Sequence, residues 1–145
     1  MLETSEMKRT KTLYWVATIL FLLPLIFSAF AYLALLPFVV AGFKMLWYPI
    51  YVIRMLGVAK LLGAGAILTG RFPRMKEWAY AGFTFDLIGA TISHIASGGP
   101  FNAGLVPLII WAVMLVSYFQ WKKLISAGDG VSISHSAPAN RAMGL

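Results

Sequence analysis

The sequence contains no cysteine among its 145 residues. This absence excludes disulfide bonds, thiolate metal sites and thiol chemistry within the chain. Catalytic motifs are missing too, since there is no glycine-rich nucleotide loop, no histidine pair at metal-binding spacing and no nucleophile elbow. Charge is scarce, because 12% of the residues are charged, against about 25% in a typical soluble domain. Nothing in the residues therefore distinguishes an enzyme from a binding protein.

Apolar residues dominate what is present. They make up 60% of the chain, and the mean hydropathy is +0.80. The length suits one compact unit. A soluble unit of this size leaves much of its surface in water and could not hide so many apolar side chains. The composition therefore predicts an integral membrane protein whose first partner is the lipid bilayer.

The charge balance is strongly basic, with 12 Lys and Arg against 5 Asp and Glu. A basic chain can indicate nucleic-acid binding. Here, however, the basic residues form short clusters that flank apolar runs, which is typical of loops retained on the cytoplasmic side of a membrane. We therefore expect no nucleic-acid partner.

Four segments are long and apolar enough to be read as membrane helices, which need about 20 residues each. They are residues 13–36, 50–69, 77–97 and 105–121. The connection between the first two lies between Pro37 and Pro49 and carries Lys44, Trp47 and Tyr48. Aromatic residues beside a lysine are typical of the membrane–water interface. The expected fold class is all-α: an integral membrane four-helix bundle with a short interfacial segment between helices 1 and 2.

This pattern divides the chain into three parts. Residues 1–12 form a cytoplasmic N-terminus, 13–123 the four-helix transmembrane domain, and 124–145 a disordered cytoplasmic tail rich in Gly, Ser, Ala and Asn. Lys and Arg are concentrated before the first span, between the second and third, and after the fourth. This asymmetry predicts a multi-pass protein of the inner (plasma) membrane with both termini in the cytoplasm.

Three ionisable residues fall inside the predicted spans: Lys60, Asp86 and His94. Such groups are costly in a bilayer and usually face the interior of a helix bundle. Lys60 lies about ten residues before the polar hinge at 70–76, and Asp86 about ten after it. In an antiparallel hairpin the two reach a similar depth, so we predict that they pair. Asp86 also shares a helix face with Ser93, which His94 borders.

Two interpretations of these polar residues stay open. Polar pairs can simply hold membrane helices together, although they contribute on average less than about 1 kcal/mol. Alternatively they line a pocket that binds or conducts something, which the clustering of three ionisable types in two spans favours. For this second interpretation the candidate ligand-binding residues are Lys60, Tyr80, Asp86 and His94. No metal site is expected, and no catalytic residue is assigned.

Several sequence segments together resemble a known family. They are Leu46-Trp47-Tyr48-Pro49, LGVAKLLGA at 56–64 and KEWAYAGFTFDLIGATISH at 76–94. They resemble the bacterial DoxX-like family of small four-helix membrane proteins, over roughly residues 8–123. One position departs from the family pattern, because Trp47 stands where the family usually has Gly. The connecting segment is therefore expected to be arranged differently here.

The resemblance implies a fold and, more loosely, a function. One relative is a subunit of a thiosulfate:quinone oxidoreductase, others are linked to redox stress complexes, and distant eukaryotic ones act as cargo receptors or assembly chaperones. The first hypothesis is thus a binding or accessory subunit of a membrane redox system. It would take a quinone as ligand and electrons from a redox partner protein or a diffusing cofactor. Lys60, Tyr80 and His94 would donate to the quinone, with Asp86 orienting them.

Two alternatives come from other functional classes. The chain could be a non-enzymatic membrane chaperone, cargo receptor or small-ligand carrier. It could also be a small transporter that uses Lys60, Asp86 and His94 and forms homo-oligomers, because four helices are few for a transporter monomer.

Overall fold

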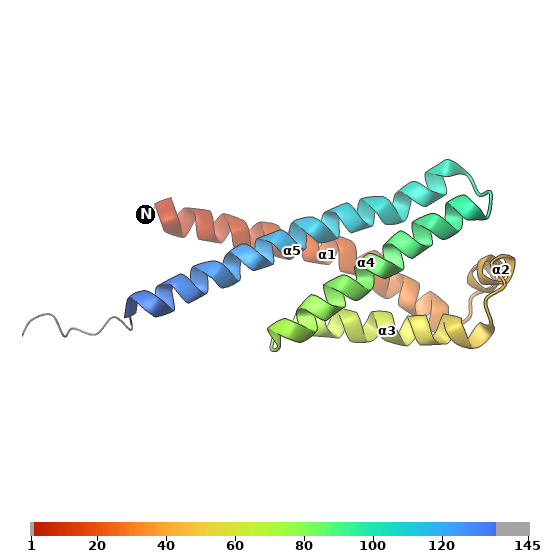
Figure 1. Ribbon diagram of the computed structural model, residues 1–145, viewed down its shortest axis with the longest axis horizontal. Coiled ribbons are helices and arrows are strands. Elements are labelled where there is room, and N and C mark those ends of the chain that lie inside the picture. Colours follow the sequence, from red (N-terminus) through yellow and green to blue (C-terminus); the bar gives the residue numbers. More distant parts are fainter. Residues whose placement is uncertain (1, 136–145) are drawn as a thin grey trace, which may run out of the picture.

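The protein is built from α-helices. The structure is a computed structural model that describes residues 2–135, with side chains for residues 4–130. Within this range the helices are α1 (Leu2–Leu33), α2 (Pro37–Met45), α3 (Ile50–Thr69), α4 (Pro73–Ala96) and α5 (Phe101–His135) (Figure 1). The described residues form no strand. The all-α prediction is confirmed, but the segment between the first two spans is a helix of its own, which makes five helices rather than four.

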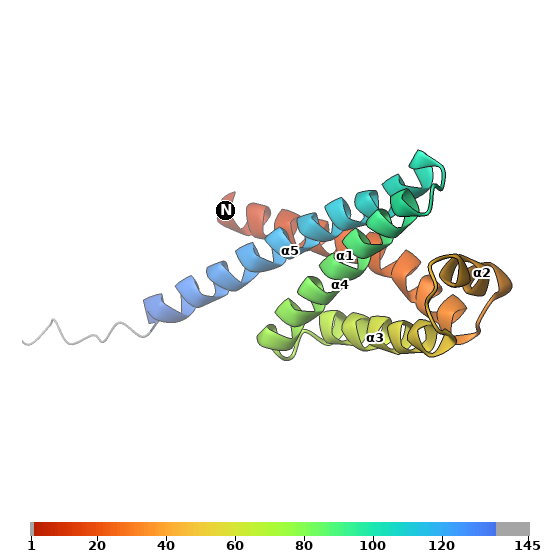
Figure 2. The same cartoon turned by 45° about the vertical axis from the view of Figure 1, so that its right-hand side comes forward.

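The four long helices pack in a ring. α1 contacts α5 and α3, and α4 contacts α5 and α3. Figures 1 and 2 show α1 and α5 extending together past the α3–α4 turn, toward the N-terminus. The short α2 lies at the opposite end and packs on α3. The two ends of the molecule therefore differ, with α2 and the α4–α5 turn at one and the α3–α4 turn at the other.

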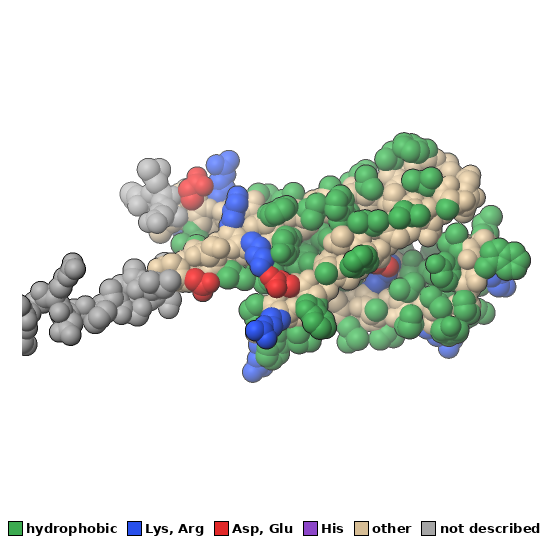
Figure 3. Space-filling model, viewed as in Figure 1, with side chains coloured by type: hydrophobic (Ala, Val, Ile, Leu, Met, Phe, Trp, Pro, Cys, Tyr) green, Lys and Arg blue, Asp and Glu red, His purple; other side chains and the backbone are tan. Residues whose placement is uncertain are grey.

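Three helices are long and apolar enough to cross a membrane. They contain the segments Thr4–Leu33, Ile50–Thr69 and Phe101–Gly130. α4 has 24 residues but carries Arg74, Lys76, Glu77 and Asp86. In Figure 3 hydrophobic side chains cover most of the visible surface, and charged ones gather toward the end where α1 begins. An apolar outer surface of this kind is what a lipid-facing bundle requires.

Helix boundaries follow local sequence signals. α3 has the predicted range. α4 starts at Pro73, earlier than the predicted residue 77, because proline fits the first turn of a helix, where no intrahelical N–H bond is needed. Gly70 ends α3 in the left-handed conformation with φ of 58°, which glycine adopts without steric cost. The hinge therefore shrinks to residues 70–72.

α5 is longer than the fourth predicted span. It continues through Lys122 and Lys123 to His135, so residues 124–135 are helical where the sequence analysis expects disorder. Propagating an existing helix costs far less than nucleating a new one, and serine and alanine do not stop it. The rest of the expected disordered tail, residues 136–145, lies outside the described residues.

The connection from α1 to α3 contains two non-glycine residues with positive φ. They are Leu35, with φ of 51°, and Trp47, with φ of 60°. Trp47 thus adopts a backbone conformation that suits glycine, at the position where the family pattern has glycine. Its side chain is 93% exposed, so it contributes little packing within the chain. The strain at Trp47 is therefore not offset by burial of its ring.

Candidate ligand-binding cavity

Lys60 and Asp86 form an ion pair between α3 and α4. Lys60 Nζ lies 3.2 Å from Asp86 Oδ2, and the two side chains are 7% and 19% exposed. The predicted pairing is confirmed. The α3–α4 hairpin accounts for it, because the tight hinge packs the two helices side by side and brings these residues to facing positions.

α1 supplies the remaining partners of Lys60. Nζ donates a hydrogen bond to Ser28 Oγ at 3.0 Å and lies 4.4 Å from the centre of the Tyr32 ring. An ammonium group has three N–H donors, and here it has three partners: a carboxylate, a hydroxyl and an aromatic face. Lys60 is therefore held at the junction of α1, α3 and α4 by one hydrogen bond, one ion pair and one aromatic contact.

Asp86 is engaged on one side only. Its Oδ2 meets Lys60, whereas within the described part of the chain its second oxygen accepts no hydrogen bond. The side chain is partly exposed and lines a large cavity. The Asp86 side chain, which lines the cavity, thus carries a carboxylate oxygen that no donor in the described part of the chain occupies.

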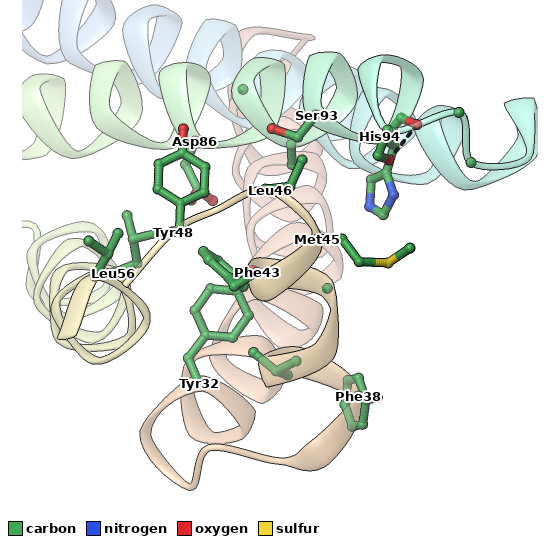
Figure 4. A pocket seen from close by; sticks show the side chains of 18 of the residues that line it. Tyr32, Phe38, Phe43, Met45, Leu46, Tyr48, Leu56, Asp86, Ser93 and His94 are labelled. Atoms are coloured by element: carbon green, nitrogen blue, oxygen red, sulfur yellow. Dashed lines mark hydrogen bonds between the residues drawn. The ribbon is translucent and has the colours of Figure 1, made fainter. Parts of the chain in front are cut away.

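The cavity lies between α2, the start of α3 and the C-terminal half of α4, and its volume is about 810 Å³. Binding sites for small molecules typically fall within about 300–1,000 Å³. Figure 4 shows side chains from α2, the segment after it, α3 and α4 around the space. Its larger apolar and aromatic lining residues are Tyr32, Phe38, Val39, Phe43, Met45, Leu46, Tyr48, Val52, Leu56 and Phe85. The walls are therefore mostly apolar, and the polar groups come chiefly from α4.

His94 lines the same cavity, farther along α4 toward the α4–α5 turn. Its eight-residue separation from Asp86 corresponds to about 12 Å along a helix axis. The imidazole is exposed and makes no hydrogen bond within the described part of the chain. Ser93 lies between the two and also lines the cavity. The structure thus brings Asp86, Ser93 and His94 to one cavity, on the face expected from their spacing.

A second, smaller hollow lies on the other side of the ion pair. It occupies about 210 Å³ between α3 and α4 and is bordered by both Lys60 and Asp86. Small residues, among them Gly63 and Gly82, form much of its lining. The ion pair therefore stands between the large cavity and a shallow groove in the α3–α4 seam.

Tyr80 lies apart from the other predicted site residues. It is 3% exposed, and its hydroxyl lies 2.8 Å from Ser117 Oγ on α5. Ser117 Oγ also lies 2.7 Å from Thr18 Oγ1 on α1. Tyr80 lines neither of the two hollows. It belongs to a buried hydrogen-bonded cluster that joins α1, α4 and α5.

Lys76 is buried although the sequence analysis placed it in a solvated hinge. Its Nζ donates to Tyr14 Oη at 2.6 Å and lies 5.0 Å from the centre of the Trp121 ring. Nearby, Lys122 forms an ion pair with Glu77. In the sequence Lys76 stands among other basic residues, so the local composition gave no sign that its side chain is buried. Only the start of α4 at Pro73 turns it inward.

Ser28 and Tyr32 are partners of Lys60 that sequence reasoning missed, and Tyr32 also lines the cavity. They lie four residues apart on α1 and so share one helix face, and both meet Lys60. Two polar side chains four residues apart in an otherwise apolar segment were the sequence feature that could have predicted this. No group of three or more His, Asp or Glu side chains in the described range could hold a metal ion.

Comparison with known proteins gives one match. The model of the DoxX-like family matches residues 16–117. These residues run from α1 to the middle of α5 and include Ser28, Lys60, Asp86 and His94. No curated protein matches the chain, and no solved structure matches it.

Proposed function

The chain belongs to the DoxX-like family, and from this premise we propose that it binds a small amphipathic molecule in the cavity beside Lys60 and Asp86. We assign it the role of a binding or accessory subunit in a quinone-linked membrane redox system. The observation that carries the proposal is the half-satisfied ion pair facing a cavity of about 810 Å³.

The proposal places the protein in the plasma membrane with four crossings and both termini in the cytoplasm. Three helices have the required length and apolarity. α4 supplies the fourth crossing, because its 24 residues extend about 36 Å, more than the roughly 30 Å of a hydrocarbon core. Its charged residues at membrane depth are accommodated inward, since Lys76 is buried and Asp86 faces Lys60.

A purely structural role for the ion pair fits the geometry less well. A pair that only fastened two helices would satisfy both partners within the protein. Here Lys60 has three partners, whereas one oxygen of Asp86 has none in the described part of the chain. The Asp86 side chain is partly exposed and lines the cavity, so a ligand can reach it and supply the missing donor.

The cavity walls favour a ligand with a flat apolar body. Aromatic rings from α1, α2, the following segment and α4 surround the space, and aromatic rings pack well against planar rings. A quinone combines such a ring with polar oxygens. Because the chain has no cysteine and no nucleotide-binding motif, the electrons would come from a redox partner protein. A carrier of another amphiphile is the alternative that the same cavity supports.

The test is direct binding to the purified protein in lipid nanodiscs. Equilibrium dialysis with a short-chain hydroquinone, kept reduced under exclusion of oxygen, should show saturable binding beyond that of empty nanodiscs. Asp86→Asn, which keeps the shape of the side chain, should weaken binding at least tenfold. Tyr80→Phe is the matched control, because Tyr80 lies outside the cavity, and should leave binding unchanged.

Mass spectrometry of a solvent extract from the same preparation separates the alternatives. Recovery of a quinone supports the redox role, and recovery of a different amphiphile supports the carrier. Absence of saturable binding together with an extract that contains only bulk lipid would overturn the proposal.

A further inference from the structure

From the distribution of donors and acceptors in the cavity we infer a selectivity: it takes amphiphiles whose head bears a hydroxyl group, such as a phenol or a hydroquinone, in preference to heads that only accept hydrogen bonds. The inference rests on the proposed function in one respect, namely that the cavity is a binding site. It adds which chemical form of the ligand binds.

The first step concerns Lys60, the strongest donor near the cavity. Its ammonium group already meets Asp86 Oδ2 at 3.2 Å, Ser28 Oγ at 3.0 Å and the Tyr32 ring at 4.4 Å. The contact with Ser28 is a hydrogen bond, and the other two are an ion pair and a contact with an aromatic face. Lys60 is not among the residues that line the cavity. The strongest donor near the cavity is therefore held by protein groups and is poorly placed for a quinone carbonyl.

The second step concerns Asp86. Its remaining oxygen has no hydrogen-bond donor in the described part of the chain, and the Asp86 side chain lines the cavity. An ionised carboxylate accepts hydrogen bonds and donates none. A hydroxyl group on the ligand head donates a hydrogen bond to this oxygen. A head that carries only acceptors displaces water from the oxygen and supplies no hydrogen bond in its place. Sites of this kind reject the analogue that lacks the hydroxyl.

The third step is that the other polar groups do not reverse the preference. Ser93, His94 and Tyr48 also line the cavity. Hydroxyl groups and neutral imidazole both donate and accept, so they tolerate either kind of head. A cationic head is disfavoured, because the Lys60 ammonium already balances the charge of the same carboxylate at 3.2 Å and would repel a second cation placed beside it. The selecting group is therefore Asp86, and it selects a neutral donor.

For a redox ligand the preference has a measurable consequence. The reduced hydroquinone has two O–H donors where the oxidised quinone has two carbonyl acceptors. The protein then binds the reduced form more tightly and raises the midpoint potential of the bound couple. A tenfold preference corresponds to about 30 mV for a two-electron couple.

The experiment compares matched ligands on the full chain in nanodiscs. One pair is a long-chain alkylphenol and its methyl ether, and the other is a short-chain hydroquinone and its quinone, handled without oxygen. Equilibrium dialysis is corrected for partition into empty nanodiscs. The hydroxyl member of each pair should bind at least tenfold more tightly. His94→Ala should keep this ratio, and Asp86→Asn, whose amide can also donate, should bring it close to one.

The outcomes separate this inference from the proposed function. Equal or tighter binding of the ether and the quinone overturns the selectivity but leaves the cavity as a binding site. A ratio that persists in Asp86→Asn also overturns it. Failure of all four ligands to bind removes both proposals. The comparison within the unmodified protein needs no variant, so a folding defect in Asp86→Asn cannot hide the answer.

Discussion

Lys60 and Asp86 show how two residues can depend on each other at membrane depth. Removing one partner leaves the other buried without a counter-charge, which typically costs about 3–5 kcal/mol, whereas removing both costs much less. We therefore expect Lys60→Met and Asp86→Leu each to lower thermal stability in detergent more than the double substitution does. Additive losses would contradict the coupling of the two side chains at 3.2 Å.

A substitution at Trp47 is expected to raise the stability of the protein rather than lower it. Its φ of 60° costs a residue with a Cβ atom roughly 1–2 kcal/mol, and its side chain is 93% exposed. Trp47→Gly should therefore raise the free energy of unfolding in detergent, by about 1 kcal/mol after the entropy cost of glycine. Trp47→Ala removes the same ring but keeps the strain, so it is the control and should show no gain. A loss of stability in the glycine variant would contradict the backbone argument.

At the scale of elements, α1 and α3 approach closely at a glycine. A Cβ atom on Gly57 would lie 3.0 Å from Leu33 Cγ and 3.1 Å from the backbone oxygen of Ala29. Gly57→Ala should therefore push the helices apart and destabilise the protein by about 1–3 kcal/mol. Gly65 on the same helix has open space around it. Gly65→Ala should be neutral or slightly stabilising in the same unfolding assay, and equal effects would contradict the close packing.

Hydrogen bonds between hydroxyl groups link α1, α4 and α5. Tyr80 bonds with Ser117, which also bonds with Thr18. Tyr80→Phe removes one of these bonds but leaves Ser117 and Thr18 paired, so the expected loss is about 1 kcal/mol. Thermal unfolding measures it. If the variant kept its stability but lost ligand binding, Tyr80 would instead be part of the binding site.

For the whole molecule, the decisive question is whether α4 crosses the membrane. If all four long helices cross, a reporter fused after the last residue and one inserted in the α3–α4 hinge at 70–72 report the same side, because α4 and α5 both lie between them. Both termini of the described chain lie at the end of the α3–α4 turn (Figure 1), where basic residues gather, so the C-terminal reporter should be cytoplasmic. Reporters on opposite sides would contradict the fourth crossing.

The sequence by itself determined the class of the protein, its helical segments and one contact. Hydropathy and helix-end signals act over a few neighbouring residues, which is why α3 has the predicted bounds. The Lys60–Asp86 contact was predictable because a short hinge fixes which residues of two adjacent helices face each other. The shared face of Asp86, Ser93 and His94 followed from helix periodicity alone.

Only the tertiary structure decided what surrounds those residues. The packing of α1 against α3 brings Ser28 and Tyr32 to Lys60, and no local sequence pattern determines how these two helices cross. Packing against α5 carries Tyr80 away from Lys60 and Asp86. The cavity exists because α2 contacts α3 and leaves space before the C-terminal half of α4. The size of such a space depends on the angles at which the packed helices cross, and the sequence of one helix alone does not set those angles.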